Sequence, residues 1–358
     1  MEPVSLSHSQ HVTNTARLVP HWRPSGWFQI GWSRGFSRGE VRPLRYFGRD
    51  LVAYRTDDGL LHVLDAHCRH LGAHLGYGGR VQDDCIVCPF HGWHWDPDGR
   101  NRYIPYQEDR PNKSRRLTSW PIHEHAGVVY MWHDLAGDGP TWAVPDIFVD
   151  TAGHTAALTY RDPAPEAQIS YGQLTLHPQL VSENAADPIH FRYVHGTRDH
   201  PVFIRRWEQE GLWFSQIGFG RRWVEMEPDS HDGDTLSILL AGVGMSYTSL
   251  SGSDNTLILL STTPIDDNTS ELFQTVWLEE LPGDDVPGAI EKRLRRATVQ
   301  LPNDIAIWEH QRFENPPALA TAEGRAYSDL RLWARQFYPT GFGAELLWNE
   351  QGSHAFAI

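Results

Sequence analysis

Two short stretches of this 358-residue chain each place a histidine just after a cysteine. Cys68 and His70 form a C-x-H segment, and after seventeen intervening residues Cys88 and His91 form a C-x-x-H segment. Two facing loops of this kind can offer two thiolates to one metal ion and two imidazoles to a second. That ligand set matches a [2Fe–2S] cluster in which two histidines replace two cysteines and raise the reduction potential.

The same four ligands also suit a structural zinc ion, which accepts two cysteines and two histidines in tetrahedral geometry. Gly72 and Gly92 follow the two histidines closely, and glycine lets the backbone pass close to a bulky inorganic core. The motif therefore predicts a Rieske-type cluster, and zinc stays open as the alternative.

A second motif, D-x-x-H-x-x-x-x-H, is formed by Asp187, His190 and His195. Two imidazoles and one carboxylate are the ligands of oxygen-activating non-haem Fe(II), which keeps open coordination positions. Asp187 and His190 would share one face of a helix. Because His190 and His195 are about 140° apart around a regular helix, the helix must be distorted or end between them if both bind one metal. An ordinary polar helix is the alternative for this stretch alone.

Together the two motifs describe a one-electron carrier beside a mononuclear iron. In this the chain resembles the oxygenase component of the Rieske non-haem iron oxygenases, from about Trp27 to Tyr338. It is most similar to the branch that holds 3-ketosteroid 9α-hydroxylase oxygenases and cholesterol 7-desaturases. The segments that carry the resemblance are Gly26–Phe28, Leu44–Gly48, Cys68–Gly72, Asn184–His195 and Asn303–Trp308.

The resemblance implies roles for three further residues. Asp304, in its D-x-x-I-W context, would be the third iron ligand, in preference to Glu309 or Glu314. Asp187 would instead link a cluster histidine of one subunit to an iron-binding histidine of its neighbour, as a carboxylate between two imidazoles can. Asn184 would lie near the iron, with an N-cap or a structural amide as the alternative.

The resemblance also suggests how the cluster is tuned. Trp93 and Trp95 stand where high-potential respiratory Rieske proteins carry hydroxyl groups that donate to the cluster sulfurs. Fewer hydrogen bonds to sulfur stabilise the reduced form less. We therefore expect a reduction potential at the low end of the Rieske range.

Composition excludes several classes of protein. A net charge of −14 argues against binding to nucleic acid or to an anionic membrane surface. There are three cysteines, so that Cys85 remains as a small buried side chain when the cluster has its ligands, and no disulfide framework is possible. These features, and the absence of a twenty-residue apolar run, predict a cytoplasmic protein without a membrane anchor.

The chain is expected to be an α+β protein: an N-terminal arm (1–24), an antiparallel β Rieske domain (25–135) and a helix-grip, START-like catalytic domain (136–358). Turn residues such as Asp57–Gly59 separate short apolar runs in the second part. The expected catalytic-domain strands are Leu212–Glu225, Thr235–Leu250, Thr256–Thr263 and Leu272–Leu278. The expected helices are Ser182–Tyr193, Val286–Arg312 and Ser328–Phe337.

The resemblance implies a terminal monooxygenase that uses O2 and hydroxylates a C–H bond of a hydrophobic, steroid-like substrate. An NAD(P)H-dependent flavin reductase, with or without a ferredoxin domain, would supply electrons, and the intersubunit link implies a homotrimer. Desaturation or oxidative demethylation of another hydrophobic metabolite is the alternative reaction. A Rieske electron carrier or a zinc-stabilised binding module is the alternative from a different class, but neither needs a second iron site.

Overall fold

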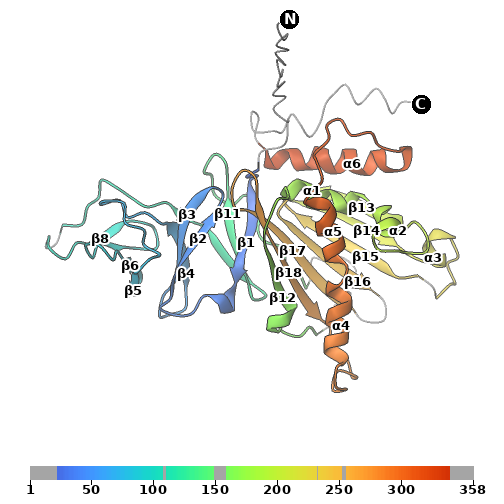
Figure 1. The fold of residues 1–358 in the computed structure, drawn as a ribbon, viewed down its shortest axis with the longest axis horizontal. Helices are drawn as coiled ribbons and strands as arrows, with labels where there is room; N and C mark the ends of the chain where they lie inside the picture. Colours follow the sequence, from blue (N-terminus) through green and yellow to red (C-terminus); the bar gives the residue numbers. More distant parts are fainter. Residues whose placement is uncertain (1–21, 108–109, 149–158, 232, 252–254, 339–358) are drawn as a thin grey trace, which may run out of the picture.

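Residues 22–107, 110–148, 159–231, 233–251 and 255–338 are described in a computed structural model of the protein. The molecule is elongated, with small β-sheets at one end and a large sheet with its helices at the other (Figure 1). Within the described ranges, no helix is both long enough and apolar enough to span a bilayer.

Three antiparallel sheets form the N-terminal part. In spatial order, the first sheet holds β1 (Gly26–Trp32), β11 (Val128–His133) and β10 (Ile122–His125). The second holds β2 (Val41–Tyr46), β3 (Arg49–Arg55), β4 (Leu61–Asp65) and β9 (Ser119–Trp120). The third holds β5 (Arg80–Gln82), β6 (Cys85–Val87), β7 (His94–Trp95) and β8 (Asn101–Tyr103). A short 3-10 turn, Ser33–Gly35, follows β1. Cys85 is buried on β6, as expected.

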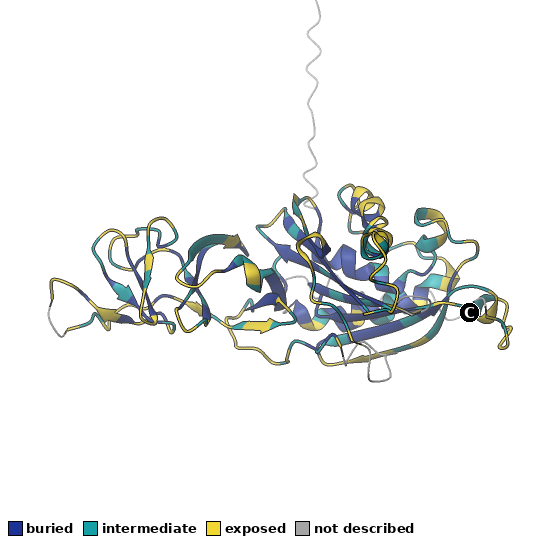
Figure 2. Cartoon of the chain, turned by 90° about the horizontal axis from the view of Figure 1, so that it is seen from below, coloured by how far each residue is buried: buried dark blue, intermediate teal, exposed yellow. Residues whose placement is uncertain are grey.

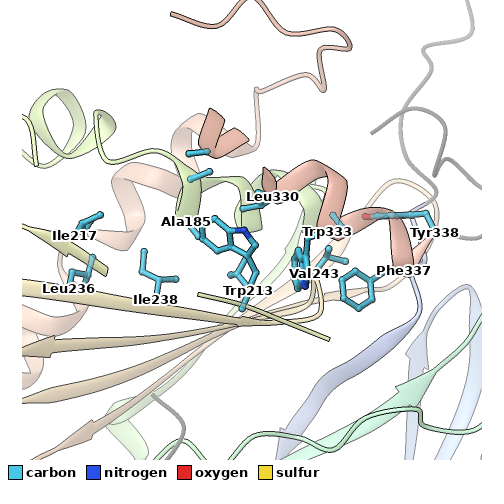
Figure 3. Packing of buried hydrophobic residues seen from close by; sticks show 14 residues of the cluster. Ala185, Trp213, Ile217, Leu236, Ile238, Val243, Leu330, Trp333, Phe337 and Tyr338 are labelled. Atoms are coloured by element: carbon cyan, nitrogen blue, oxygen red, sulfur yellow. The ribbon is translucent and has the colours of Figure 1, made fainter. Parts of the chain in front are cut away.

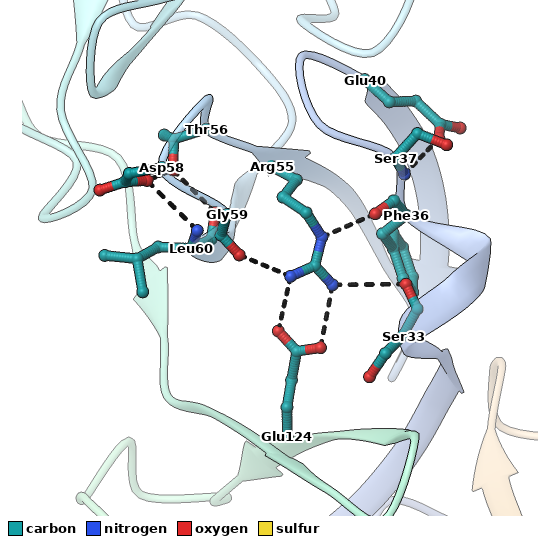
Figure 4. Close-up of polar contacts among 10 residues, drawn as sticks. All are labelled: Ser33, Phe36, Ser37, Glu40, Arg55, Thr56, Asp58, Gly59, Leu60 and Glu124. Atoms are coloured by element: carbon teal, nitrogen blue, oxygen red, sulfur yellow. Dashed lines mark hydrogen bonds and ion pairs between the residues drawn. The ribbon is translucent and has the colours of Figure 1, made fainter. Parts of the chain in front are cut away.

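Arg55, at the end of β3, joins the second sheet to the first (Figure 4). Its guanidinium donates to both carboxylate oxygens of Glu124 on β10, each at 2.9 Å, and to the carbonyls of Phe36 and Gly59. The Gly59 carbonyl belongs to the predicted Asp57–Gly59 turn, where Gly59 has a φ of 98°. One planar side chain thereby holds two sheets and a turn in a fixed arrangement.

One seven-stranded antiparallel sheet forms the C-terminal part. Its spatial order is β12 (Gln168–Leu174), β18 (Ser270–Leu278), β17 (Thr256–Pro264), β16 (Met245–Ser251), β15 (Thr235–Ala241), β14 (Leu212–Gly218) and β13 (Val202–Gln209). The helices are α1 (Pro178–Glu183), α2 (His190–Val194), α3 (Arg221–Val224), α4 (Ala289–Thr298), α5 (Leu301–Trp308) and α6 (Thr321–Ala334). Short 3-10 turns cover Pro165–Ala167, Asn184–Ala186 and Arg335–Phe337.

The two faces of the large sheet are buried against different layers, because side chains alternate along each strand. On one face Ile238 and Leu240 of β15 pack with Ala185, Leu330 and Trp333 from the helical layer (Figure 3). The opposite face packs against the first N-terminal sheet; the residues of this cluster include Trp27, Tyr130, Trp132, Leu239, Ala241, Tyr247 and Trp277. Buried residues accordingly concentrate in the sheet strands (Figure 2).

The α+β class is confirmed, but several expected elements were wrong in extent. The expected strand Thr235–Leu250 is two strands, because Gly242 has a φ of 63° and turns the chain back. The strand that begins at Leu212 ends at Gly218 and is followed by α3 instead of continuing to Glu225.

The expected helices differ as well. The expected helix Ser182–Tyr193 is broken at Asp187 and Pro188, where proline disfavours a helical conformation in the residue before it. The expected helix Val286–Arg312 is divided into α4 and α5, and α6 begins seven residues before Ser328. The apolar run Leu236–Leu240 is packed in the core.

Candidate metal sites

Two loops with the same backbone turns bring the four predicted cluster ligands together. The Gly72 N–H donates to the Cys68 carbonyl at 2.9 Å, and the Gly92 N–H donates to the Cys88 carbonyl at 3.0 Å. Both glycines have positive φ values, 79° and 68°, which explains the residue type at each turn. The rings of His70 and His91 meet edge to face with centroids 4.7 Å apart.

The cysteine side chains of these loops are buried and close to each other. Cys68 and Cys88 are each 2% exposed, and all three cysteines of the chain, which all lie in described ranges, are free. A hydrogen bond from the Cys68 thiol, with backbone N–H groups of Phe90 and His91, lowers the pKa of Cys88 to about 6, while that of Cys68 is raised. The pair thus favours a thiolate at Cys88, which is the form that binds metal.

The residues present fit a [2Fe–2S] cluster. The Nδ1 atom of His91 is buried and has no hydrogen-bond partner within the described part of the chain. A buried imidazole nitrogen without a partner is costly unless a metal or another group completes it. Two free thiols and an unpartnered imidazole nitrogen at one place therefore match the predicted ligand set.

The second site brings residues from two separate segments together. Ligand atoms of His190, His195 and Asp304 all lie within 4.8 Å of one another, and His195 Nε2 is 3.4 Å from Asp304 Oδ1. His190 begins α2, which ends at Val194 with His195 as its C-cap, so that the helix ends between the two histidines, one of the two expected arrangements. Asp304 lies on α5. The buried residues Leu301, Ile305 and Trp308 of this helix pack with Leu272 of β18 and Val181 of α1.

The remaining ring nitrogens of both histidines have partners of their own. His190 Nδ1 makes a short contact with the carbonyl oxygen of Asp187, and His195 Nδ1 lies 3.3 Å from Gln300 Oε1. Each histidine therefore presents Nε2 toward the shared centre, and the outer partner fixes the ring orientation. Gln300 was missed from the sequence, although it lies four residues before Asp304, a spacing that places two side chains on one helix face.

The pKa values of the two histidines are shifted in opposite directions. Burial lowers the pKa of His190 despite the nearby carboxylates of Asp187 and Asp304. Burial alone would lower the pKa of His195 as well, but the hydrogen bond and charge of Asp304 raise it above its usual value. Two imidazoles and a carboxylate with free ligand atoms match the facial arrangement that non-haem Fe(II) uses.

Asp187 lies beside this group and outside any helix. Its Oδ1 accepts hydrogen bonds from the backbone N–H groups of Ile189 and His190, and its Oδ2 lies 4.0 Å from His190 Nδ1. Burial and the charge of the nearby Asp187 carboxylate raise the pKa of the half-buried Tyr327 on α6. Tyr327 has no signal in the sequence that would link it to Asp187.

Asn184 and Glu183 come just before this segment. Asn184 is half-buried and is the C-cap of α1, so the N-cap alternative for it was wrong. Glu183, to which no role was given, is buried in an ion pair with Arg331. Of the two alternatives to Asp304, Glu309 follows α5 at its end and Glu314 lies beyond it; neither belongs to the histidine group.

Two family models match consecutive parts of the chain. Residues 26–121 match the family described as Rieske [2Fe-2S] domain, and residues 131–338 match 3-Ketosteroid 9alpha-hydroxylase C-terminal domain. The oxygenase component of 3-ketosteroid-9-alpha-monooxygenase from Rhodococcus rhodochrous is 30% identical over 94% of this chain and 88% of that protein. Cholesterol 7-desaturase from Hemicentrotus pulcherrimus is 28% identical over 89% of this chain and 71% of that protein.

Solved structures share the fold. Dicamba monooxygenase bound to dicamba superimposes with a TM-score of 0.63 at 18% identity, over 89% of this chain and 99% of that one. Pseudomonas putida CBB5 NdmA with caffeine has a TM-score of 0.65 at 16% identity, over 90% and 94% of the two chains.

These matches answer the alternatives left open by the sequence. The matched N-terminal family is defined by a [2Fe–2S] cluster and not by zinc, and the C-terminal match excludes a bare electron carrier. Rieske oxygenases also hold a mononuclear iron, and an oxygenase component receives its electrons from a reductase. The chain therefore belongs to the Rieske oxygenases, in the group with a C-terminal domain of the 3-ketosteroid 9α-hydroxylase family, and is an O2-using oxygenase component with both iron groups as cofactors.

Proposed function

We propose that this oxygenase component hydroxylates a C–H bond of an apolar, polycyclic, steroid-like substrate. The observation that carries the oxygenase chemistry is the grouping of His190, His195 and Asp304 within 4.8 Å. The substrate class follows from the family matched over residues 131–338 and from the relative in Rhodococcus rhodochrous, whose name states a 3-ketosteroid.

The residues divide between two metal groups. In this proposal the cluster is held by Cys68, Cys88, His70 and His91. The mononuclear iron is held by His190, His195 and Asp304. When bound, the two groups supply single electrons and activation of O2. Asn184, half-buried one turn before Asp187, would lie beside the iron.

The two sites lie at opposite ends of one chain. Figure 1 shows β6 and β7, which flank the second cluster loop, at one end of the molecule, and α2 at the other. An electron therefore has to pass between copies of the chain. We propose a closed homotrimer in which Asp187 links a cluster histidine of one subunit to His190 of the next; head-to-tail contacts of this kind close into rings.

We also propose domain boundaries, an electron donor and a cell compartment for the protein. The domains are an arm over 1–24, a Rieske domain over 25–135 and a catalytic domain over 136–358. Residues 1–21 and 339–358 lie outside the described residues. The electron donor is an NAD(P)H-dependent flavin reductase with or without a ferredoxin domain. Free cysteines at buried positions suit a reducing cytoplasm.

Desaturation is the second candidate reaction. It is favoured by the cholesterol 7-desaturases among the relatives, one of which covers 89% of this chain. The same metal chemistry can remove two hydrogen atoms from a substrate or deliver one oxygen to it. The position of the substrate, and not the ligand set, decides between these outcomes.

A single turnover tests the proposal. The cluster- and iron-loaded protein is reduced, exposed to O2 with a panel of 3-ketosteroids and sterols, and the products are weighed by mass spectrometry. A gain of one oxygen supports the hydroxylase, a loss of two hydrogens supports the desaturase, and a loss of a methyl group indicates demethylation. Reoxidation of the cluster without any product from the panel would contradict the steroid substrate.

A further inference from the structure

Backbone N–H groups of both cluster loops act on the cysteine sulfurs. Those of Phe90 and His91 favour the thiolate of Cys88, and that of His70 favours the thiolate of Cys68. The C-x-H loop is one residue shorter than the C-x-x-H loop.

A side chain from a separate strand donates to the Cys68 sulfur. Trp95, on β7, points its indole Nε1–H at the Cys68 sulfur with an N-to-S distance of 3.3 Å. The Trp95 side chain is fully buried, and its backbone pairs with Ile86 on the strand that leads to Cys88. The Cys68 sulfur thus receives a side-chain donor from outside its own loop.

We propose that the Trp95 indole completes the donor set of the Cys68 thiolate and thereby raises the reduction potential of the cluster. This inference rests on the assignment of the cluster to Cys68 and Cys88, but not on the substrate. Hydrogen bonds to sulfur are one of the means by which a protein sets the potential of such a cluster. The bond strengthens when the added electron increases the negative charge on sulfur, and a buried site has little water to screen it.

The structure corrects the expectation drawn from the sequence, in which both tryptophans counted as lost donors. Trp93 does not donate to sulfur: its indole N–H donates to the hydroxyl of Tyr106 at 2.8 Å. Its ring instead stacks on His70, with centroids 4.5 Å apart and an angle of 5° between the planes. The two tryptophans therefore contact different ligands of the cluster, Cys68 and His70, and Trp93 supplies a matched control.

The test compares Trp95→Phe with Trp93→Phe by a redox titration at one fixed pH, followed by circular dichroism and EPR. Trp95→Phe keeps a buried ring but removes the donor. We expect it to weaken the preference of the site for the reduced cluster roughly tenfold, which lowers a one-electron potential by about 59 mV. Trp93→Phe should shift the potential much less. An unchanged potential in Trp95→Phe, or an equal shift in both variants, would overturn the proposal.

A second measurement does not depend on the folding of Trp95→Phe. The unmodified chain and Trp93→Phe are made with 15N in the tryptophan indoles, and the reduced cluster is studied by pulsed EPR. We expect a weak 15N coupling that persists in Trp93→Phe; its absence from the unmodified protein would overturn the proposal. Iron content and visible spectrum report separately whether the cluster is present. A colourless protein would contradict the cluster assignment itself, whereas a failed steroid turnover would leave the Trp95 result standing.

Discussion

Arg331 of α6 and Glu183 of α1 form a buried two-point ion pair. Arg331 Nε lies 2.8 Å from Glu183 Oε1, and Nη2 lies 2.9 Å from Oε2, while both side chains are only 6% exposed. Gln179 also donates to the Glu183 carboxylate at 3.1 Å. The pair fixes α6 against the turn that leads to Asp187, and the pKa of Tyr327 on the same helix is raised by burial and by the Asp187 charge.

Removing the guanidinium should destabilise the protein strongly. Arg331→Met leaves the Glu183 carboxylate buried without its partner, and loss of one member of a buried pair costs about 3–5 kcal/mol. Urea unfolding, followed by tryptophan fluorescence, measures this. The control is Arg325→Met on the same helix, because Arg325 is 89% exposed and only 3.9 Å from Asp329. Comparable losses in the two variants would show that burial of the pair has no special importance.

Loss of the Asp304 carboxylate should remove the mononuclear iron and leave the cluster. We expect Asp304→Ala to contain about two thirds of the iron of the unmodified protein, since the cluster holds two irons of three. Metal analysis with the visible and EPR spectra of the cluster measures both groups. Glu309→Ala, five residues further along the chain, should keep all the iron. Retention of full iron by Asp304→Ala would rule out this residue as a ligand.

Asp187→Asn should separate electron transfer from metal binding. An asparagine still accepts from the Ile189 and His190 N–H groups, so both metals should remain bound. Without the negative charge, reoxidation of the cluster during a single turnover should slow roughly 10- to 100-fold, as for other changes behind a metal ligand. Stopped-flow absorbance measures the rate. Asp199→Asn in the same region is the control, and a normal rate in Asp187→Asn would refute the bridging role.

Asp284 should contribute stability that depends on pH. Burial would raise the pKa of this carboxyl, but the Leu281 N–H and the guanidinium groups of Arg161 and Arg293 hold it below its usual value of 3.8. A depressed pKa means that the stabilisation is complete well above pH 3.8 and is lost as the pH falls through the folded-state pKa.

Asp284→Asn removes this contribution. At pH 7 the free energy of unfolding of the variant should be lower by about 3 kcal/mol, which is the lower end of the range for removing one partner of a buried ion pair. The difference from the unmodified protein should shrink as the pH falls below about 4. Urea midpoints measured across this pH range test it, with the exposed neighbour Asp285→Asn as the control. A difference that stays constant at low pH would contradict the assigned cause.

The sequence determined the features that depend on residue type and short spacing. Cys68, His70, Cys88 and His91 lie in loops only a few residues long, so their spacing already limits which ligand atoms can converge. The five residues from His190 to His195 required the helix to be distorted or to end, and α2 ends between them. Pro188 carried the signal for the helix break before it, although the sequence interpretation placed a continuous helix there.

Only the tertiary structure decided the contacts between distant segments. Trp95 meets Cys68 and Arg331 meets Glu183, and Asp304, which the family resemblance implied, reaches His195, because the sheet register and the packing of α5 and α6 bring them together. No local pattern specifies such a pair. The local sequence around an indole on a short strand or an arginine on a helix is the same whether the side chain faces water, a carboxylate or a thiolate. Its contact partner is decided by the packing of the whole fold.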